Sequence, residues 1–126
     1  MIYMDMYFTL VNNIFNQVCK ILKIQNFKLR IINRRTQKVR RLGYINLKTQ
    51  TIGIDILTPK RREPKSINSI IRVLAHELAH YQKKPYRQFF RGAWINRIHY
   101  PQFYRQVNKN ISKIKKDKVL GKYFTK

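Results

Sequence analysis

Acidic residues are scarce in this chain of 126 residues. It has five Asp and Glu against 28 Lys and Arg, which gives a formal net charge of +23 at pH 7. A charge of this size repels itself in a compact state unless a polyanion or salt screens it. We therefore expect nucleic acid as a partner, ahead of an anionic membrane surface or an acidic protein.

Cysteine and long apolar runs are also lacking. The single Cys19 excludes an intrachain disulfide and favours a reducing compartment. The longest apolar stretch is interrupted by Asn12, Asn13, Asn16 and Gln17. No run therefore reaches the 18 residues that a membrane helix needs. Met1–Leu10 contains Asp5 and lacks a basic start, which argues against a secretory signal. We expect an intracellular protein, in the cytoplasm or in a nucleoid- or nucleus-like compartment.

Three segments have apolar residues at three- and four-residue steps, the spacing of an amphipathic helix. The first covers residues 4–24. The second follows Ser66, a suitable N-cap, and stops one or two residues before Pro85, which bars its continuation. The third begins at Pro101, a residue tolerated in the first turn, and leads into a basic tail over residues 115–126.

Strand patterns fall between the first and second helices. Residues 27–32 alternate apolar and basic side chains, and residues 44–47 and 52–57 read as two strands joined by a short hairpin turn. They predict a small, mostly antiparallel three-stranded sheet, hence a single α+β domain over residues 1–126. We expect residues 53–57 to form an open sheet edge that accepts an extended peptide.

The second helix carries the pattern H-E-x-x-H in an apolar run. His76 and His80 lie four residues apart, so they project from one face and can bind one Zn²⁺. Glu77 would lie beside the open coordination position, where it can take a proton from water. The alternative is a pair of ordinary core or surface histidines on an amphipathic helix.

A catalytic zinc site needs a third protein ligand. No glutamate follows Glu77, so the downstream candidates are His99 and, less favourably, Asp117. His99 is the only histidine outside the motif, so one metal site would account for every histidine in the chain. Alone, His99 would be read as a partly buried structural residue.

The segment His99-Tyr100-Pro101-Gln102-Phe103, together with the H-E-x-x-H helix, resembles SprT-like and WLM-type minimal zinc metalloproteases, which are zincins. Their corresponding segment reads His-Gly-Pro-Glu-Phe, so a tyrosine here replaces the glycine. The resemblance implies one Zn²⁺ held by His76, His80 and His99, with Glu77 as general base and a protein or peptide as substrate. Some members act on proteins attached to DNA, which implies a nucleic-acid-bound substrate.

Other roles stay open at the level of sequence. Tyr81, Tyr100 and Tyr104 are candidates for stabilising the oxyanion of the tetrahedral intermediate. Asp55, Asp117 or a backbone carbonyl could accept a hydrogen bond from a ligating imidazole.

Basic and aromatic clusters are candidates for contacts with nucleic acid. The basic candidates are Arg34, Arg35, Arg40, Arg41, Arg61, Arg62, Lys113, Lys115 and Lys116. Residues 86–98 mix large aromatic side chains with arginines. They predict a packing loop with a helical turn or, alternatively, a lid or a surface for single-stranded nucleic acid.

Two functions are compatible with these patterns. The first is a zinc-dependent endopeptidase. The second is a non-catalytic nucleic-acid-binding protein, for packaging or in a ribonucleoprotein, on a zincin scaffold. The presence of Glu77 favours the enzyme, because a purely structural zinc site does not need that carboxylate.

Overall fold

A computed structural model describes residues 2–32, 43–58 and 63–124, with side chains from residue 5 onward. The elements are α1 (Ile2–Leu22), β1 (Lys28–Ile32), β2 (Gly43–Asn46), β3 (Thr51–Asp55), α2 (Ile67–Gln82), β4 (Tyr86–Phe90), β5 (Ala93–Arg97), α3 (Pro101–Lys115) and the 3₁₀ helix η1 (Gly121–Phe124). The α+β class is confirmed: three α-helices accompany one three-stranded sheet, and β4 and β5 form a separate pair.

The N-terminal helix α1 ends in a left-handed residue. Lys23 has a φ of 58°, and its N–H donates to the carbonyl of Lys20 at 3.2 Å. The N–H of Ile24 donates to the carbonyl of Cys19 at 2.9 Å, so two carbonyls of the last turn are satisfied by the chain as it leaves the helix. No helix in the described part of the chain is both long and apolar enough to cross a membrane.

The three-stranded sheet is mixed, with β3 between β1 and β2. Lys28 of β1 pairs with Thr51 in a parallel register, whereas Gly43 of β2 pairs with Ile54 in an antiparallel one. The expected hairpin of β2 and β3 is confirmed, but β1 is parallel to its neighbour. Because β1 and β2 run in opposite directions on the two sides of β3, one of the two pairs must be parallel. Side-chain alternation within a strand does not specify the direction of its partner.

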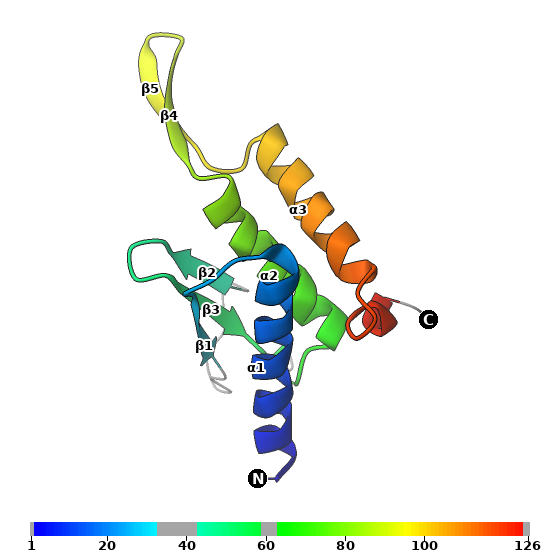
Figure 1. The fold of residues 1–126 in the computed structure, drawn as a ribbon. Helices are drawn as coiled ribbons and strands as arrows, with labels where there is room; N and C mark the ends of the chain where they lie inside the picture. Colours follow the sequence, from blue (N-terminus) through cyan, green and yellow to red (C-terminus); the bar gives the residue numbers. More distant parts are fainter. Residues whose placement is uncertain (1, 33–42, 59–62, 125–126) are drawn as a thin grey trace.

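The expected open edge over residues 53–57 is therefore wrong. β3 is hydrogen-bonded on both sides, to β1 and to β2, so it cannot accept a further strand. Its completely buried Ile52 and Ile54, with Ile56 just after the strand, instead supply the centre of the core. They pack with apolar residues of α1 and α2, the helices that lie beside this sheet in Figure 1.

Helix α2 is built as expected and packs along α3. Ser66 caps it, with its hydroxyl accepting from the N–H of Ser69, and Lys83 is the C-cap. Asn110 of α3 is fully buried and donates to the carbonyl of Ala75 and to Oε1 of Gln82 on α2. Since a buried amide is costly unless it is hydrogen-bonded, this side chain fixes how the two helices meet.

The basic C-terminal segment is attached to the body as far as Phe124. Asp117 accepts from the N–H groups of Val119 and Leu120 through one oxygen and from Nε2 of Gln17 through the other. Leu120 is only 1% exposed and belongs to the core. Asp117 therefore holds a turn and links it to α1.

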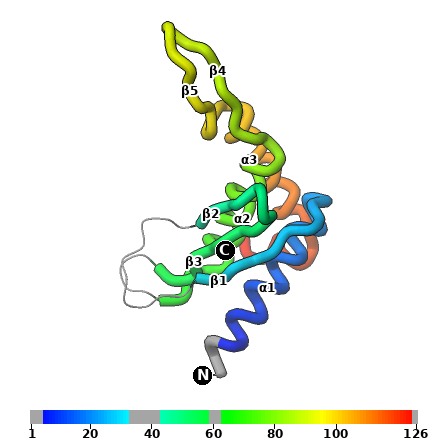
Figure 2. Tube along the Cα trace, turned by 90° about the vertical axis from the view of Figure 1, so that its left-hand side faces the viewer, coloured from blue at the N-terminus to red at the C-terminus, as the bar shows by residue number. Residues whose placement is uncertain are grey.

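Residues 86–97 form a β-hairpin that projects away from the body, as Figures 1 and 2 show. The expected packing loop with a helical turn is wrong. Arg91 and Gly92 make the two-residue turn with φ values of 49° and 81°, the left-handed pair that a type I′ hairpin turn needs. The Arg-Gly pair is not the usual Asn-Gly signal of such a turn, so the sequence marked this hairpin weakly.

We expect Gly53→Ala to destabilise the sheet. Tyr44 lies opposite Gly53, and a Cβ added to Gly53 would overlap the Tyr44 ring. Moving that ring should cost about 1–3 kcal/mol of unfolding free energy, measurable by urea denaturation. In a Tyr44→Ala background the same change should cost clearly less, because the obstructing ring is gone. An equal penalty in both backgrounds would contradict this explanation.

Candidate functional site

Three imidazoles converge where α2 meets the start of α3. His76 and His80 project from successive turns of α2, and His99 lies two residues before α3. Each histidine has a ring nitrogen within 4.8 Å of such a nitrogen on the other two. The ring centroids are 5.1 Å apart for His76–His80, 5.5 Å for His76–His99 and 4.9 Å for His80–His99. Three nitrogen donors at this spacing could hold one metal ion.

The Phe103 ring packs against all three imidazoles. It stacks on His80 with a centroid separation of 4.3 Å, and its ring lies 5.0 Å from His76 and 5.2 Å from His99. Pro101 occupies the first turn of α3 and so starts the helix at the point where Phe103 faces inward, fully buried. Its contact with the three rings excludes water from the inner side of the cluster.

Burial and neighbouring rings favour the neutral form of His76 and His80. Burial, followed by the nearby His76 and His99, lowers the pKa of His80 to about 4, and burial with His99 also lowers the pKa of His76. A neutral imidazole offers a lone pair, whereas a protonated one does not. The donor set therefore fits Zn²⁺, which prefers nitrogen ligands and low coordination number.

Glu77 lies on α2 beside the histidines, where strand β2 approaches the helix closely. Its side chain is 8% exposed, on the part of α2 that β2 contacts. A Cβ added to Gly43 of β2 would lie 2.8 Å from Cγ1 of Val73 and 3.4 Å from Oε2 of Glu77. Only a glycine lets β2 lie this close to α2. The sequence patterns did not indicate Gly43, although a glycine in a strand, in a chain with only four, was an available signal.

A cleft of about 490 Å³ joins the histidines to the sheet. Its lining includes the three histidines and Glu77, residues of β2 and its following turn such as Leu47, and Pro85 and Ile98 at the two ends of the hairpin. β2 pairs with β3 on one side, and no described strand pairs with its other side. An unpaired strand edge therefore borders the cleft.

The three candidate tyrosines lie in different surroundings. The Tyr81 ring packs edge-on against Phe27 at 4.9 Å, and the Tyr100 hydroxyl donates to the carbonyl of Lys84 at 3.0 Å. The Tyr104 ring, which is half exposed, stacks on His99 with a centroid separation of 6.1 Å. Tyr104 is thus the tyrosine in contact with the cluster, and its role as an oxyanion donor stays a prediction.

Two aspartates, Asp117 and Asp55, were candidates for contacts with the histidines. Asp117 accepts hydrogen bonds within its turn and from Gln17, whereas His99 lies with the two motif histidines. Asp55 accepts from the N–H of Leu57, and its suggested hydrogen bond to a ligating histidine stays a prediction.

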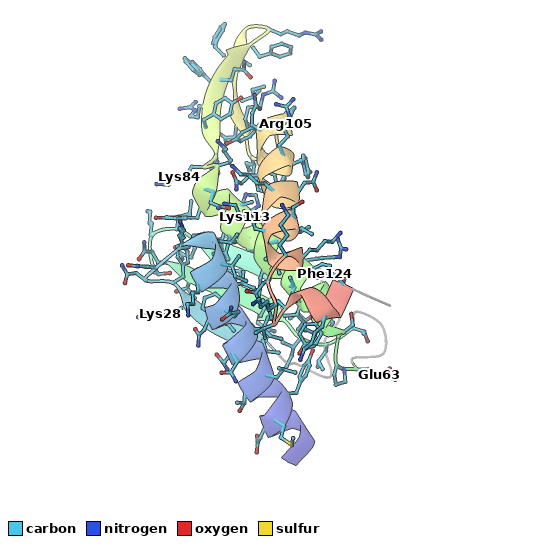
Figure 3. All side chains as sticks on the ribbon, turned by 45° about the vertical axis from the view of Figure 1, so that its right-hand side comes forward. Lys28, Glu63, Lys84, Arg105, Lys113 and Phe124 are labelled. Carbon is cyan, nitrogen blue, oxygen red and sulfur yellow. The ribbon has the colours of Figure 1, made fainter. Side chains whose placement is uncertain are left out.

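Most of the predicted basic contact residues lie outside the described part of the chain: Arg34, Arg35, Arg40, Arg41, Arg61 and Arg62. Lys113, Lys115 and Lys116 are described and exposed at the end of α3. α3 begins beside the hairpin and ends away from it, so these three lysines lie at its opposite end (Figure 1). Figure 3 shows Lys113 on this helix, with Arg105 nearer the hairpin and Lys84 near the end of α2.

Comparisons with known proteins include a structural similarity. No protein-family model matches the chain, and no curated protein sequence matches it. The fold resembles the crystal structure of the metallopeptidase zymogen of Pyrococcus abyssi abylysin, with a TM-score of 0.48 and 20% sequence identity. The similarity covers 90% of this chain and 87% of that chain.

Without metal, the protein should lose stability as the pH falls from 7 to 4. Unfolded His80, with a pKa near 6.5, gains a proton in this window, whereas the folded residue, with a pKa of about 4, does not. The unfolded state then binds more protons, so this residue lowers the unfolding free energy by up to about 3 kcal/mol. Urea denaturation with a chelator at several pH values measures the effect.

The matched variant for this measurement is His80→Gln, which removes the titrating ring. Its stability should depend less steeply on pH over the same window. The carboxylate background is small because the chain has only five acidic residues. An equally steep dependence in His80→Gln would show that another group causes the loss.

Proposed function

We propose that the protein is a zinc-dependent endopeptidase. The supporting observation is the convergence of three histidines and one glutamate on a single cleft bordered by a strand edge. His76, His80 and His99 would hold the ion. Bound zinc supplies Lewis acidity, which polarises a carbonyl and lowers the pKa of water.

Glu77 would perform the proton transfers. Its carboxylate lines the cleft together with the histidines but does not belong to the three-nitrogen cluster. We assign it the role of general base: one carboxylate oxygen accepts the proton of the attacking water molecule and then delivers it to the nitrogen of the leaving amine. Its low exposure keeps bulk water from competing for that proton.

The substrate would bind in an extended conformation along β2. This strand replaces the segment 53–57 as the edge we propose for substrate pairing, because β2 borders the cleft whereas β3 is paired on both sides. Backbone hydrogen bonds to a strand edge bind any sequence that can extend. The exposed Ile98, which lines the same cleft, would contact an apolar substrate side chain.

We further propose, as the resemblance to SprT-like proteases implies, that the substrates are proteins bound to nucleic acid. Support comes from charge: residues 78–116 contain no acidic residue, and this segment includes both ends of the hairpin and the third histidine. Such a surface attracts polyanions and would hold them close to the cleft. A non-catalytic nucleic-acid-binding role would give the same binding without dependence on Glu77.

We expect purified protein to bind one Zn²⁺ per chain, measured by elemental analysis after gel filtration. Zinc should raise the unfolding free energy of chelator-treated protein by about 4 kcal/mol at a thousandfold excess over its Kd. His99→Ala should reduce zinc affinity by at least about tenfold, because one of three ligands is lost. Gln102→Ala, an exposed change three residues away, is the control. Equal affinity in His99→Ala would exclude that ligand.

We expect Glu77→Gln to impair proteolysis, assayed on a quenched fluorescent casein with zinc present. Loss of the general base should lower kcat by about 10²–10⁴-fold, with zinc content unchanged. Glu63→Gln, which alters the only other glutamate, is the matched control and should cleave normally. Zinc-dependent cleavage that persists in Glu77→Gln would refute the mechanism.

A further inference from the structure

The β4–β5 hairpin, residues 86–97, is called the aromatic hairpin below. Its two strands contact each other and no other described helix or strand. A two-stranded ribbon alone is marginally stable and has no core of its own. The Tyr86 ring packs on Tyr100 at 5.0 Å, but Phe89, Phe90 and Trp94 are 45–62% exposed, and their exposure requires another explanation.

One face of the aromatic hairpin presents Phe89 and Trp94. These residues pair directly across the strands, and their rings meet edge to face at 5.4 Å. Trp94 is 62% exposed and Phe89 is 58% exposed. The guanidinium of Arg87 lies 5.4 Å from the Trp94 ring centroid, so a cation and an aromatic surface are presented together.

The opposite face repeats this combination. Phe90 is exposed there, and the guanidinium groups of Arg91 and Arg97 lie 5.0 Å and 5.6 Å from its ring centroid. Nε of Arg97 also donates to Oε1 of Gln88 on β4 at 2.8 Å, which restrains the guanidinium. Both faces therefore combine an exposed ring with arginine.

We propose that the aromatic hairpin binds single-stranded nucleic acid. Bases stack on exposed aromatic rings whatever their sequence, and arginines beside the rings neutralise the phosphates. Charge complementarity supports this partner, because the hairpin holds Arg87, Arg91 and Arg97 and has no acidic residue. The chemistry is shared by DNA and RNA, so both are tested.

Two other polyanionic partners fit less well. In a duplex the bases already stack on one another, so Phe89 and Trp94 would have no base face to contact. In a membrane the tip of the hairpin would enter deepest, and the tip residue is Arg91, whose charge is costly to place among acyl chains. Single strands use both the rings and the arginines.

The aromatic hairpin lies next to the cleft, so nucleic acid bound to it would lie near the proposed active site. Pro85 and Ile98, immediately before and after it, both line the cleft. A protein attached to the bound strand would thus be held next to Glu77 and the histidines. This consequence depends on the peptidase activity, whereas binding itself does not.

The chain has a single tryptophan, so Trp94 reports directly on the hairpin. We expect an oligothymidylate and an oligouridylate to quench its fluorescence on binding, and a DNA duplex of the same length to quench much less. Anionic phospholipid vesicles provide the membrane comparison. Glu77→Gln should give the same quenching as the unaltered protein, which separates binding from catalysis.

Affinity is measured by anisotropy of labelled oligothymidylate over a range of salt concentrations. Trp94→Ala should weaken binding about tenfold without changing the slope of log affinity against log salt, because no charge is lost. Trp94→Tyr retains a ring and should restore most of the affinity, so a loss of folding is distinguished from a loss of stacking. Val119→Ala, at an exposed site outside the hairpin, is the control.

Three results would overturn the proposal. The first is oligonucleotide binding that leaves the Trp94 fluorescence unchanged. The second is equal affinity in Trp94→Ala, which would mean that the net positive charge alone binds the strand. The third is quenching by vesicles with no quenching by oligonucleotides, which would identify the hairpin as a membrane contact.

Discussion

The packing of Phe103 against three imidazoles is the contact on which the arrangement of the site depends. It joins two histidines of α2 to a third that precedes α3, so it links segments that are distant in sequence. Asn110 fixes the same pair of helices further along, by donating from α3 to groups of α2. One apolar and one polar anchor together determine where α3 begins, and therefore where His99 lies. The convergence of the histidines thus depends on how α2 and α3 pack together.

The scarcity of acids shapes both the fold and the site. Glu77 is the only acidic residue between Glu63 and Asp117, so this half of the chain has few ion pairs available to it. Apolar packing and neutral hydrogen bonds must supply the stability there, and the buried Ile70, Ile71 and Leu74 of α2 and the Asn110 network do so. Neutral imidazoles also suit a metal site here, because they add no charge of their own to a strongly cationic chain.

The sequence predicted the parts that depend on local periodicity. The helix with H-E-x-x-H, its Ser66 cap and its end before Pro85 follow from side-chain spacing and backbone chemistry, as does the β2–β3 hairpin. The place of β3 between its neighbours did not follow, because alternation identifies a strand but not its partners. Gly43 was missed for a related reason: its closeness to Val73 and Glu77 exists only after β2 has packed on α2. Arg91-Gly92 is not a strong turn signal, so the sequence predicts a loop where the structure has a hairpin.

The aromatic hairpin lies between the second and third histidines in the sequence. Tyr86 pairs with Arg97, so the two ends of the hairpin lie side by side however far the tip extends. Although 18 residues separate His80 from His99, the hairpin returns to its starting point, so the two histidines can lie close together. The position of His99 is then set at the base of the hairpin and by α3, not by the length or composition of the strands. This separation lets the hairpin carry exposed rings and arginines while the geometry of the histidine cluster stays fixed.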